Sequence, residues 1–362
     1  MSISGGPSAV NMLRTALPSR KQTLTLDACI HGDSESLDRW LSHFGTERET
    51  LQTLGRSAER LRRLLSLLYL RIREHDIGLD KTVVTYLRVA RVREQLRTEA
   101  VQQACNRVLT TVCNSGATPI VLKGVALAET AYPDPSTRHC HDLDLLLPHD
   151  AIGPAVTELL RTGFGRIESP PSASVESVWV ADRSGFPIGI HASLHRVGAW
   201  NALMPGAVSR SVARNISGVA VRILSPVDAL LHVCCSGLAA GSWFSPCWAA
   251  DASFLIEKNG GAIDWNDLVE KARAGNQAKA AAVAFEYLKS ELRAAIPAWV
   301  IDALRASSMT SVEIDSLWAA LLLSVRERKL GFIRRCGNPV EGAHAAWWLL
   351  TRRQETRETV NA

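Results

Sequence analysis

The chain has 362 residues, of which 46% are hydrophobic and 21% charged, a balance that excludes whole-chain disorder and suits two or three globular domains. Its net charge of +5, from 41 Lys and Arg against 36 Asp and Glu, suits a phosphate-bearing ligand but not a dedicated nucleic-acid coat. Because the sequence has neither a signal-like N-terminus nor a run of about 18 apolar residues, we expect a cytoplasmic protein with no membrane partner.

The cysteines are spread along the chain. There are eight of them, without a CxxC pair or a repeated spacing. A structural zinc site needs clustered thiolates or imidazoles, so the spacing argues against one. We predict reduced thiols that pack as small hydrophobic groups.

The first hundred residues are predicted to be helical. Leu61, Leu64, Leu65 and Leu68 follow the i, i+3, i+4, i+7 spacing of one apolar helix face. The arginines around this face are Arg60, Arg62, Arg63, Arg71 and Arg73. Such residues ordinarily form a solvated helix surface, and contact with phosphate or nucleic acid is the alternative. A second helix is expected over residues 86–113.

The middle of the chain combines short β-branched runs with helical stretches, which predicts an α/β core. The expected strands cover residues 119–122, 141–147, 175–180, 187–194 and 219–224. Between the first two, Gly124 leads into a helix over residues 125–131, and two prolines keep residues 132–135 in a loop. Asp150 is expected to cap the next helix and Gly163 to end it.

The clearest boundary in the sequence lies where the chain becomes helical again. Ser225 fits an N-cap, Pro226 fits the first helical position, and Asp228 suits the positive end of a helix. The pattern is mainly helical from there on. We therefore predict an α+β fold in which a small mixed sheet with helices is flanked by helical regions. Its three parts are an N-terminal helical region (1–100), an α/β core (101–224) and a C-terminal helical domain (225–362).

Two carboxylates alternate with leucines in the strand predicted at residues 141–147. Asp142 and Asp144 are expected on one strand face, roughly 7 Å apart along the chain, with the intervening Leu143 facing a core. Adjacent carboxylates repel each other unless a cation lies between them. Mg²⁺ binds one or two carboxylates together with waters and substrate phosphates. The DxD pair is therefore a candidate metal site, although the pattern also arises by chance on exposed strand edges.

Three further residues near this pair are suited to phosphate. Gly124, between a strand and a helix, lets a phosphate approach the backbone, and the helix presents its free N–H groups. Lys123 adds a mobile positive charge. Arg138 lies in the loop before the acidic strand, where a guanidinium can bind phosphate oxygens in a bidentate manner. An ordinary strand–helix turn and a surface arginine are the plainer interpretations.

Taken together, these residues resemble the signature of the uncharacterised bacterial nucleotidyltransferases, distant relatives of the polymerase-β fold. The matching elements are Leu122-Lys123-Gly124, Tyr132-Pro133, Arg138 and Asp142-Leu143-Asp144-Leu145-Leu146. The order and the spacing agree, so the match is more specific than DxD alone. Leu224-Ser225-Pro226 and Trp248-Ala249-Ala250-Asp251 extend the similarity towards the C-terminus.

The resemblance implies a nucleotidyltransferase-type core and a metal-dependent transferase. Asp142 and Asp144 would hold Mg²⁺ or Mn²⁺, while Lys123, Gly124 and Arg138 would bind a nucleoside triphosphate, most simply ATP. An acceptor hydroxyl or phosphate would attack the α-phosphorus and release pyrophosphate. Some relatives accompany gene clusters for ribosomally made peptides, and the acceptor is left open among peptide, RNA, protein and small molecule.

The chain departs from the family pattern at the expected third carboxylate. Relatives are expected to have an acid two residues before a His, but here Gly189 precedes His191. His191 is a candidate base or metal ligand, with a hydrogen-bonded strand residue as the alternative. Glu176 and Asp182, in the hairpin predicted there, are candidates to return a carboxylate to the site. Ser236 lies near a helical position where relatives often have a His.

Three other functions compete with nucleotidyl transfer. The same site would act as a kinase if the γ-phosphate faced the acceptor, and the product mass separates the two reactions. Loss of the third carboxylate would fit a non-catalytic scaffold that binds a nucleotide or a peptide. A DxD glycosyltransferase would prefer nucleotide sugars and Mn²⁺, but it leaves Lys123 and Gly124 unexplained.

Overall fold

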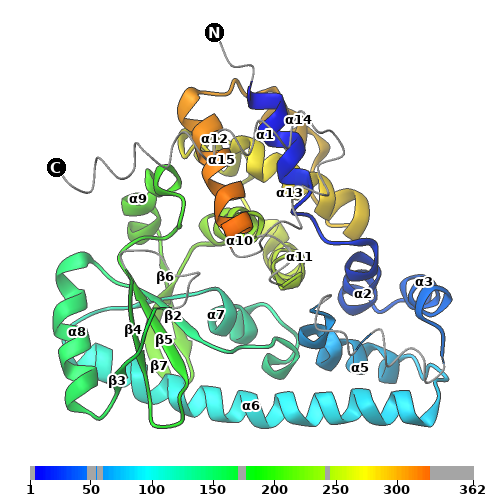
Figure 1. Cartoon of the computed structure of the whole chain (residues 1–362), viewed down its shortest axis with the longest axis horizontal. Coiled ribbons are helices and arrows are strands. Elements are labelled where there is room, and N and C mark those ends of the chain that lie inside the picture. The colour runs from blue at the N-terminus through cyan, green and yellow to red at the C-terminus, as the bar shows by residue number, and fades with distance from the viewer. Residues whose placement is uncertain (1–4, 47–53, 55–59, 170–176, 241–244, 327–362) are drawn as a thin grey trace.

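Helices form both ends of the described chain, and the strands lie between them (Figure 1). The computed structural model describes residues 5–46, 54, 60–169, 177–240 and 245–326. The helices before the first strand are α1 (Gly5–Arg14), α2 (Arg20–Ile30), α3 (Ser34–Phe44), η2 (Leu61–Leu64), α5 (Leu65–Glu74) and α6 (Lys81–Asn114). Those after the last strand are α10 (Pro226–Ala240), α11 (Cys247–Asn259), η5 (Gly260–Ala262), α12 (Trp265–Ala274), α13 (Ala278–Leu292), α14 (Ala298–Ala306) and α15 (Ser311–Arg326). Within these described ranges, no helix is both long and apolar enough to cross a membrane.

The described strands form one mixed sheet in the order β3-β4-β5-β2-β1-β7-β6. They are β1 (Ile120–Leu122), β2 (Leu143–Leu146), β3 (Gly165–Arg166), β4 (Ser177–Ala181), β5 (Pro187–His191), β6 (Val212–Ile216) and β7 (Val219–Ile223). The helical segments among them are α7 (Lys123–Thr130), η3 (Pro135–Thr137), α8 (His149–Arg161), η4 (Gly198–Asn201) and α9 (Met204–Ser209). The central strand β2 is antiparallel to β1 and parallel to β5. This small mixed sheet flanked by helices confirms the predicted α+β fold class.

Separate apolar clusters cover the two faces of the sheet. Leu143 and Leu145 of β2 belong to the cluster that includes side chains of α6 and α8. Leu122 and Leu146 belong to the larger cluster, which is built mainly from the N- and C-terminal helices. Because side chains alternate along a strand, Asp144 lies on the face of Leu146, towards the C-terminal helices.

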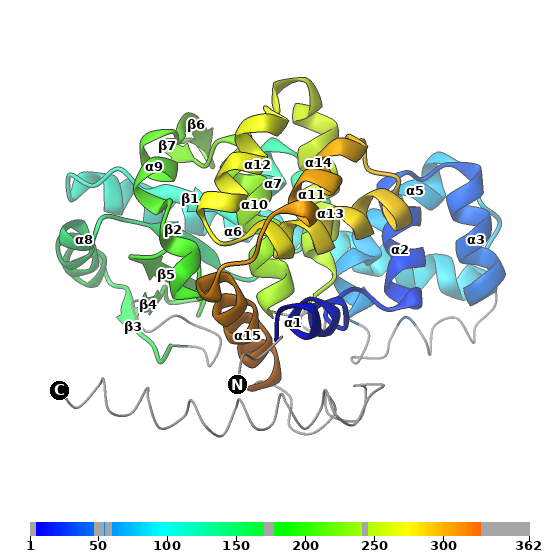
Figure 2. The same ribbon diagram turned by 90° about the horizontal axis from the view of Figure 1, so that it is seen from above.

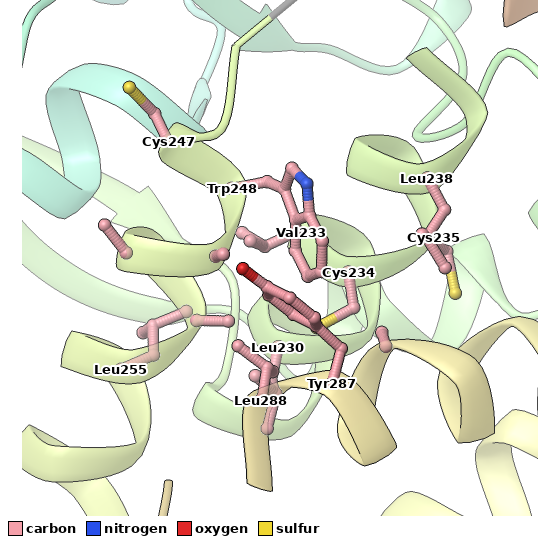
Figure 3. Packing of buried hydrophobic residues seen from close by; sticks show 14 of the residues in the cluster. Leu230, Val233, Cys234, Cys235, Leu238, Cys247, Trp248, Leu255, Tyr287 and Leu288 are labelled. Carbon is pink, nitrogen blue, oxygen red and sulfur yellow. The ribbon is translucent and has the colours of Figure 1, made fainter. Parts of the chain in front are cut away.

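The C-terminal helices pack closely around α10 (Figure 3). The ring centroids of Trp248 and Tyr287, from α11 and α13, are 5.9 Å apart. A Cβ at Gly237 of α10 would come within 2.4 Å of Trp248, so a side chain there would displace the indole. In addition, α1 contacts α13 and α15, and α2 contacts α11 and α13 (Figure 2). Helices from both ends of the chain therefore share one core, while the boundaries at 100/101 and 224/225 stay predictions.

Several local predictions are confirmed. Leu61, which heads the predicted apolar face, is fully buried, as are its partners at helical spacing. Gly163 follows α8 with a positive φ of 96°, a backbone conformation that glycine adopts without steric cost. Ser225 Oγ accepts a hydrogen bond from the Asp228 N–H at 3.3 Å, as expected of an N-cap.

Other local predictions differ from the structure. Helix α8 begins at His149, so Asp150 lies in its first turn and does not cap it. Strand β5 ends at His191, three residues before the predicted limit of 194. Strands β3 and β6 were not expected, because β3 has two residues and the middle of β6 is exposed, which removes the apolar alternation of a half-buried strand.

The described cysteines match their predicted packing role. Cys29, Cys105, Cys113, Cys140, Cys234, Cys235 and Cys247 are free, and all but Cys113 are buried. Burial raises the pKa of the Cys140 thiol to about 12. The buried thiols therefore pack as small apolar groups. Cys336 lies outside the described residues.

Candidate active site

Asp142 and Asp144 form a partly buried pair at the start of β2, called here the Asp pair. Their side chains are 28% and 21% exposed. Burial, followed by the charge of Asp144, raises the pKa of Asp142 to about 7, although Arg138, Lys123 and Arg63 oppose the shift. Such a carboxyl is half protonated near neutral pH. The local excess of negative charge is the electrostatic condition under which a bound cation is favoured.

Asp144 is kept ionised by its neighbours. Burial acts to raise its pKa, but the hydrogen bond and the charge of His191 outweigh burial and lower it. The distance from His191 Nε2 to Asp144 Oδ1 is 2.9 Å. The imidazole N–H donates to the carboxylate, which fixes the orientation of both side chains. His191 thus lies beside the Asp pair, and a catalytic role for it stays a prediction.

Gly189 lies directly opposite Asp144 on the parallel strand β5, where the resemblance places the third carboxylate. A Cβ at Gly189 would be 2.7 Å from His191 Nε2 and 2.9 Å from the Trp179 ring. These contacts are too close for a real Cβ atom. The His191 imidazole and the edge of Trp179, whose ring centroids are 5.8 Å apart, therefore fill the space over Gly189.

Lys123 lies at the turn from β1 into α7, beside the Asp pair. Its positive charge lowers the pKa of both Asp142 and Asp144. The φ of Lys123 is 40°. The left-handed backbone at this turn therefore belongs to Lys123 and not to Gly124. A Cβ at Gly124 would make only an ordinary 3.6 Å contact with the Cys140 sulfur. The binding of a phosphate at Gly124 stays a prediction.

Arg138 has a buried ionic partner. Its Nε and Nη2 donate to the two carboxylate oxygens of Asp251, at 2.7 and 2.9 Å, and its Nη1 donates to the His139 carbonyl. The hydroxyl of Tyr132 donates to the same Asp251 at 2.7 Å. We call Tyr132, Arg138 and Asp251 the Arg138 clamp. It joins the loop before β2 to α11, and the predicted contact of Arg138 with a nucleotide stays a prediction.

The sequence reasoning missed this clamp, although it had noticed all three members. Tyr132, Arg138 and Asp251 each belong to the motifs that carry the family resemblance. A lone Asp in an apolar helical run, such as Asp251, indicates a buried ion pair. Arg138 and Tyr132 were its candidate partners. The separation of 113 residues between Arg138 and Asp251 gave no indication that they meet.

Helix α6 holds the same loop from its other side. Arg91 donates to Asp134 at 2.6 Å, and Glu94 lies 2.9 Å from the Nδ1 atom of His139. Arg63, on η2, is close enough for its charge to lower the pKa of His141 and to oppose the raised pKa of Asp142. One of the arginines of the N-terminal helices therefore lies near the Asp pair.

The hairpin carboxylate Asp182 does not reach the Asp pair. Asp182 lies in the turn between β4 and β5, where its Oδ1 accepts from the backbone N–H groups of Ser184 and Phe186. Its other oxygen accepts from Arg107 at 2.8 Å. This turn precedes β5, whereas His191 is at the far end of that strand. Glu176 lies outside the described residues.

A second group of polar side chains lies in the interface between the sheet and α10. Ser236, identified in the sequence as a departure, has its Oγ 3.3 Å from the Nδ1 atoms of both His195 and His232. His195 Nε2 is 3.1 Å from the side-chain nitrogen of Gln277. His232 was missed in the sequence, although a lone histidine one helical turn before Ser236 in an apolar helix was a visible signal.

The donors at the Asp pair suit a divalent metal that shares its ligands with a substrate. No group of three or more His, Cys, Asp or Glu side chains with metal-site geometry occurs among the described residues. Two hard carboxylate oxygens with an unbalanced charge fit Mg²⁺, which is commonly bound by one or two carboxylates and completed by phosphates and water. A site that the protein alone completes would need more ligands than this.

The comparison with protein families identifies the chain. Residues 53–292, more than half of its length, match the family described as uncharacterised nucleotidyltransferase. The chain therefore belongs to this family, whose description supports a transferase enzyme. None of the curated proteins with which it was compared matches it.

Proposed function

We propose that this protein transfers a nucleotidyl group from ATP, bound with Mg²⁺ at the Asp pair, to an acceptor in the cleft between the sheet and the C-terminal helices. The observation that carries the proposal is the placement of two partly buried carboxylates, Asp142 and Asp144, at the start of β2 and close to the charge of Lys123, an arrangement that raises the pKa of Asp142. An acid pair that is electrostatically unfavourable by itself suits a ligand that brings a cation. Membership of the nucleotidyltransferase family supports the reaction class.

The residues have separate roles in this proposal. Asp142 and Asp144 hold the metal, which supplies charge neutralisation on the triphosphate and orients it for in-line displacement. Lys123 and the free N–H groups at the start of α7 bind phosphate oxygens. His191 donates to Asp144 and keeps that carboxylate ionised and oriented. An acceptor oxygen forms its bond to the α-phosphorus as the bond to the pyrophosphate oxygen breaks.

His191 takes the place that a third carboxylate would occupy. It lies over Gly189 and contacts Asp144. With two carboxylates instead of three, the site has fewer protein ligands for a second metal. We therefore propose that one metal and the cationic side chains of the protein neutralise the negative charge of the triphosphate. When His191 is neutral and donates from Nε2 to Asp144, its Nδ1 can take the acceptor proton.

Calorimetric titration with ATP tests the proposal. We expect measurable binding with Mg²⁺ and binding at least tenfold weaker with EDTA. Equal affinity under both conditions would remove the metal role of the Asp pair. Mass spectrometry of the products from a panel of peptides, RNAs and small hydroxyl compounds then distinguishes a nucleotidyl adduct from a phosphoryl adduct. The phosphoryl adduct would identify a kinase.

A further inference from the structure

A cavity of about 380 Å³ borders Lys123. Lys123 on α7, Arg214 on β6 and Lys258 on α11 give its lining positive charge, and His232 on α10 also lines it. The rest of the lining is largely apolar and includes Val121, Ala126, Leu127, Leu224 and Leu255. A ligand with an anionic group and an apolar body would match this composition.

The acidic lining residue does not cancel these positive charges. Glu129 carries the only carboxylate among the described residues that line the cavity. Both of its oxygens are engaged, because they accept from the backbone N–H and the hydroxyl of Ser217 at 2.8 and 2.7 Å. The cavity therefore presents three cations against one carboxylate that is already hydrogen-bonded.

A chain of hydrogen bonds fixes the protonation of His195 next to this cavity. The side-chain nitrogen of Gln277 lies 3.3 Å from the Trp200 carbonyl, which can only accept, so this nitrogen donates. The same nitrogen lies 3.1 Å from His195 Nε2, which must then accept. A neutral imidazole that accepts at Nε2 carries its proton at Nδ1. Burial lowers the pKa of His195 to about 3, so the ring is neutral.

The same donor-to-acceptor order of hydrogen bonds continues from His195 through Ser236 to His232. The Nδ1–H of His195 donates to Ser236 Oγ. Among the described residues, the other polar atom within hydrogen-bond distance of this Oγ is His232 Nδ1, so the serine hydroxyl donates its own hydrogen to that ring nitrogen. The proton of His232 is consequently on Nε2. Burial, followed by the charge of Lys123, holds the pKa of His232 well below its usual value, so this ring is neutral as well.

The last donor of the chain is unsatisfied. His232 is 1% exposed, and its Nε2 has no hydrogen-bond partner among the described residues. Buried polar groups in folded proteins are nearly always paired, so an unpaired ring N–H beside a cavity indicates a missing acceptor. His232 and three cationic side chains line the same cavity. A bound oxyanion would accept this hydrogen bond and balance the positive charge.

We propose that this cavity binds the phosphate or carboxylate group of a small acceptor molecule, with His232 Nε2–H as its hydrogen-bond donor and Arg214 and Lys258 as its counter-ions. Lys123 lines this cavity, and its charge also acts on both members of the Asp pair, so a ligand held here is near the nucleotide. The identity of the ligand as the acceptor rests on the proposed nucleotidyl transfer. The binding of an oxyanion does not.

Titration of the full chain with inorganic phosphate in EDTA tests the anion site. Arg214 and Lys258 are exposed on the surface, so Arg214→Gln and Lys258→Gln should leave the fold intact. We expect each to weaken phosphate binding at least fivefold, and the double variant more than either. Arg88→Gln and Lys81→Gln are matched controls on exposed positions of α6, and they should bind phosphate like the parent. Equal affinities in all variants would overturn the proposal.

Histidine ring signals test the donor directly. In protein labelled with ¹⁵N-histidine, phosphate should shift one Nε2–H resonance, and this resonance should be absent from His232→Gln. If that variant does not fold, Ser236→Ala still tests the donor, because loss of the hydroxyl frees the His232 tautomer and should weaken phosphate binding. Phosphate binding without any change in a histidine Nε2–H signal would exclude His232 as the donor.

Two further titrations separate this inference from the proposed function. Asp142→Asn should lose Mg²⁺–ATP binding but keep phosphate binding in EDTA. Phosphate should also bind when the parent is already saturated with Mg²⁺ and a non-hydrolysable ATP analogue. Competition between the two would assign the cavity to the triphosphate tail and overturn its assignment to the acceptor.

Discussion

The Arg138 clamp contains a buried carboxylate and the Asp pair contains two partly buried ones, although Arg138 precedes Asp142 by only four positions in the sequence. In the clamp, Asp251 receives three hydrogen bonds, two of them from a guanidinium. In the Asp pair, two acids lie together, and the pKa of Asp142 rises to about 7 through burial and the charge of Asp144. The clamp is electrostatically complete and holds two elements together, whereas the Asp pair needs a ligand.

The difference shows that motif residues can have opposite duties within one short stretch. A residue whose polar atoms are all paired inside the protein stabilises the fold. Its substitution leaves the buried charge of its partner without a counter-ion. A residue whose charge is unbalanced costs stability and gains a partner when a ligand binds. Substitutions in the two regions should therefore give opposite effects on stability and on ligand binding.

The largest expected effect is on transfer by variants of the Asp pair. Asp142→Asn and Asp144→Asn should each lower the rate by about 10³-fold or more, because the metal loses a ligand at the reacting phosphate. Each should also lose the rise in Tm that Mg²⁺–ATP gives the parent, since a ligand stabilises only the state that binds it. The double variant should resemble the single ones. A full thermal shift and undiminished transfer in both single variants would show that the acidic strand is only a polar edge.

The clamp should show the opposite pattern. Arg138→Met leaves the Asp251 carboxylate buried without its ionic partner, which should cost about 3–5 kcal/mol and lower the Tm by roughly 10 °C. Pairing it with Asp251→Leu should restore part of this loss, because the double variant has no unpaired charge. Arg161→Met, at an exposed ion pair on α8, is the matched control and should leave the Tm unchanged. A stable Arg138→Met protein that no longer binds ATP would instead place Arg138 in the nucleotide site.

Two variants of Lys123 separate the contribution of its charge to ATP binding from the cost of its left-handed backbone to stability. Lys123→Ala should weaken Mg²⁺–ATP binding about tenfold through loss of the ammonium, which corresponds to about 1.4 kcal/mol. Lys123→Gly should weaken binding equally. It should also be more stable than Lys123→Ala by about 1 kcal/mol, because glycine adopts the left-handed backbone at φ 40° without strain. Calorimetry and thermal melts of both variants measure the two effects. Unchanged ATP affinity would reject Lys123 as a phosphate ligand.

The smallest expected effects concern the pH dependence of the Asp pair. A metal binds the ionised form of Asp142, so the apparent Mg²⁺ affinity should rise from pH 6 towards pH 7 and level off above the pKa of about 7. The folded protein holds this proton more tightly than the unfolded chain does, so the carboxyl destabilises the folded state progressively as pH rises from about 4 to about 7. Asp142→Asn should therefore gain Tm over the metal-free parent across this range, by a few degrees at most. A constant difference between pH 4 and pH 8 would contradict the raised pKa.

Much of the fold and part of the site could be predicted from local patterns. Alternation placed Asp142 and Asp144 on one strand face, and Ser225-Pro226 marked the return to helices, because both features depend on residues that are neighbours in the sequence. The resemblance put Gly189 at the position of the third carboxylate, and the register of β2 and β5 sets this residue opposite Asp144. The family was identified from the order and the spacing of the motif residues.

Only the tertiary structure decided which charged residues are satisfied. The sequence showed Arg138 as a phosphate-binding candidate, but α11 brings Asp251 to it from 113 residues away. The position of α10 likewise places His232 beside a cavity with a cationic lining. The hydrogen bonds from Gln277 through His195 and Ser236 leave the Nε2–H of His232 without a partner among the described residues. Local sequence determines where a side chain lies along a strand or a helix, because those periodicities are short. Whether its charge or its N–H group finds a partner depends on segments that only the folded chain brings together.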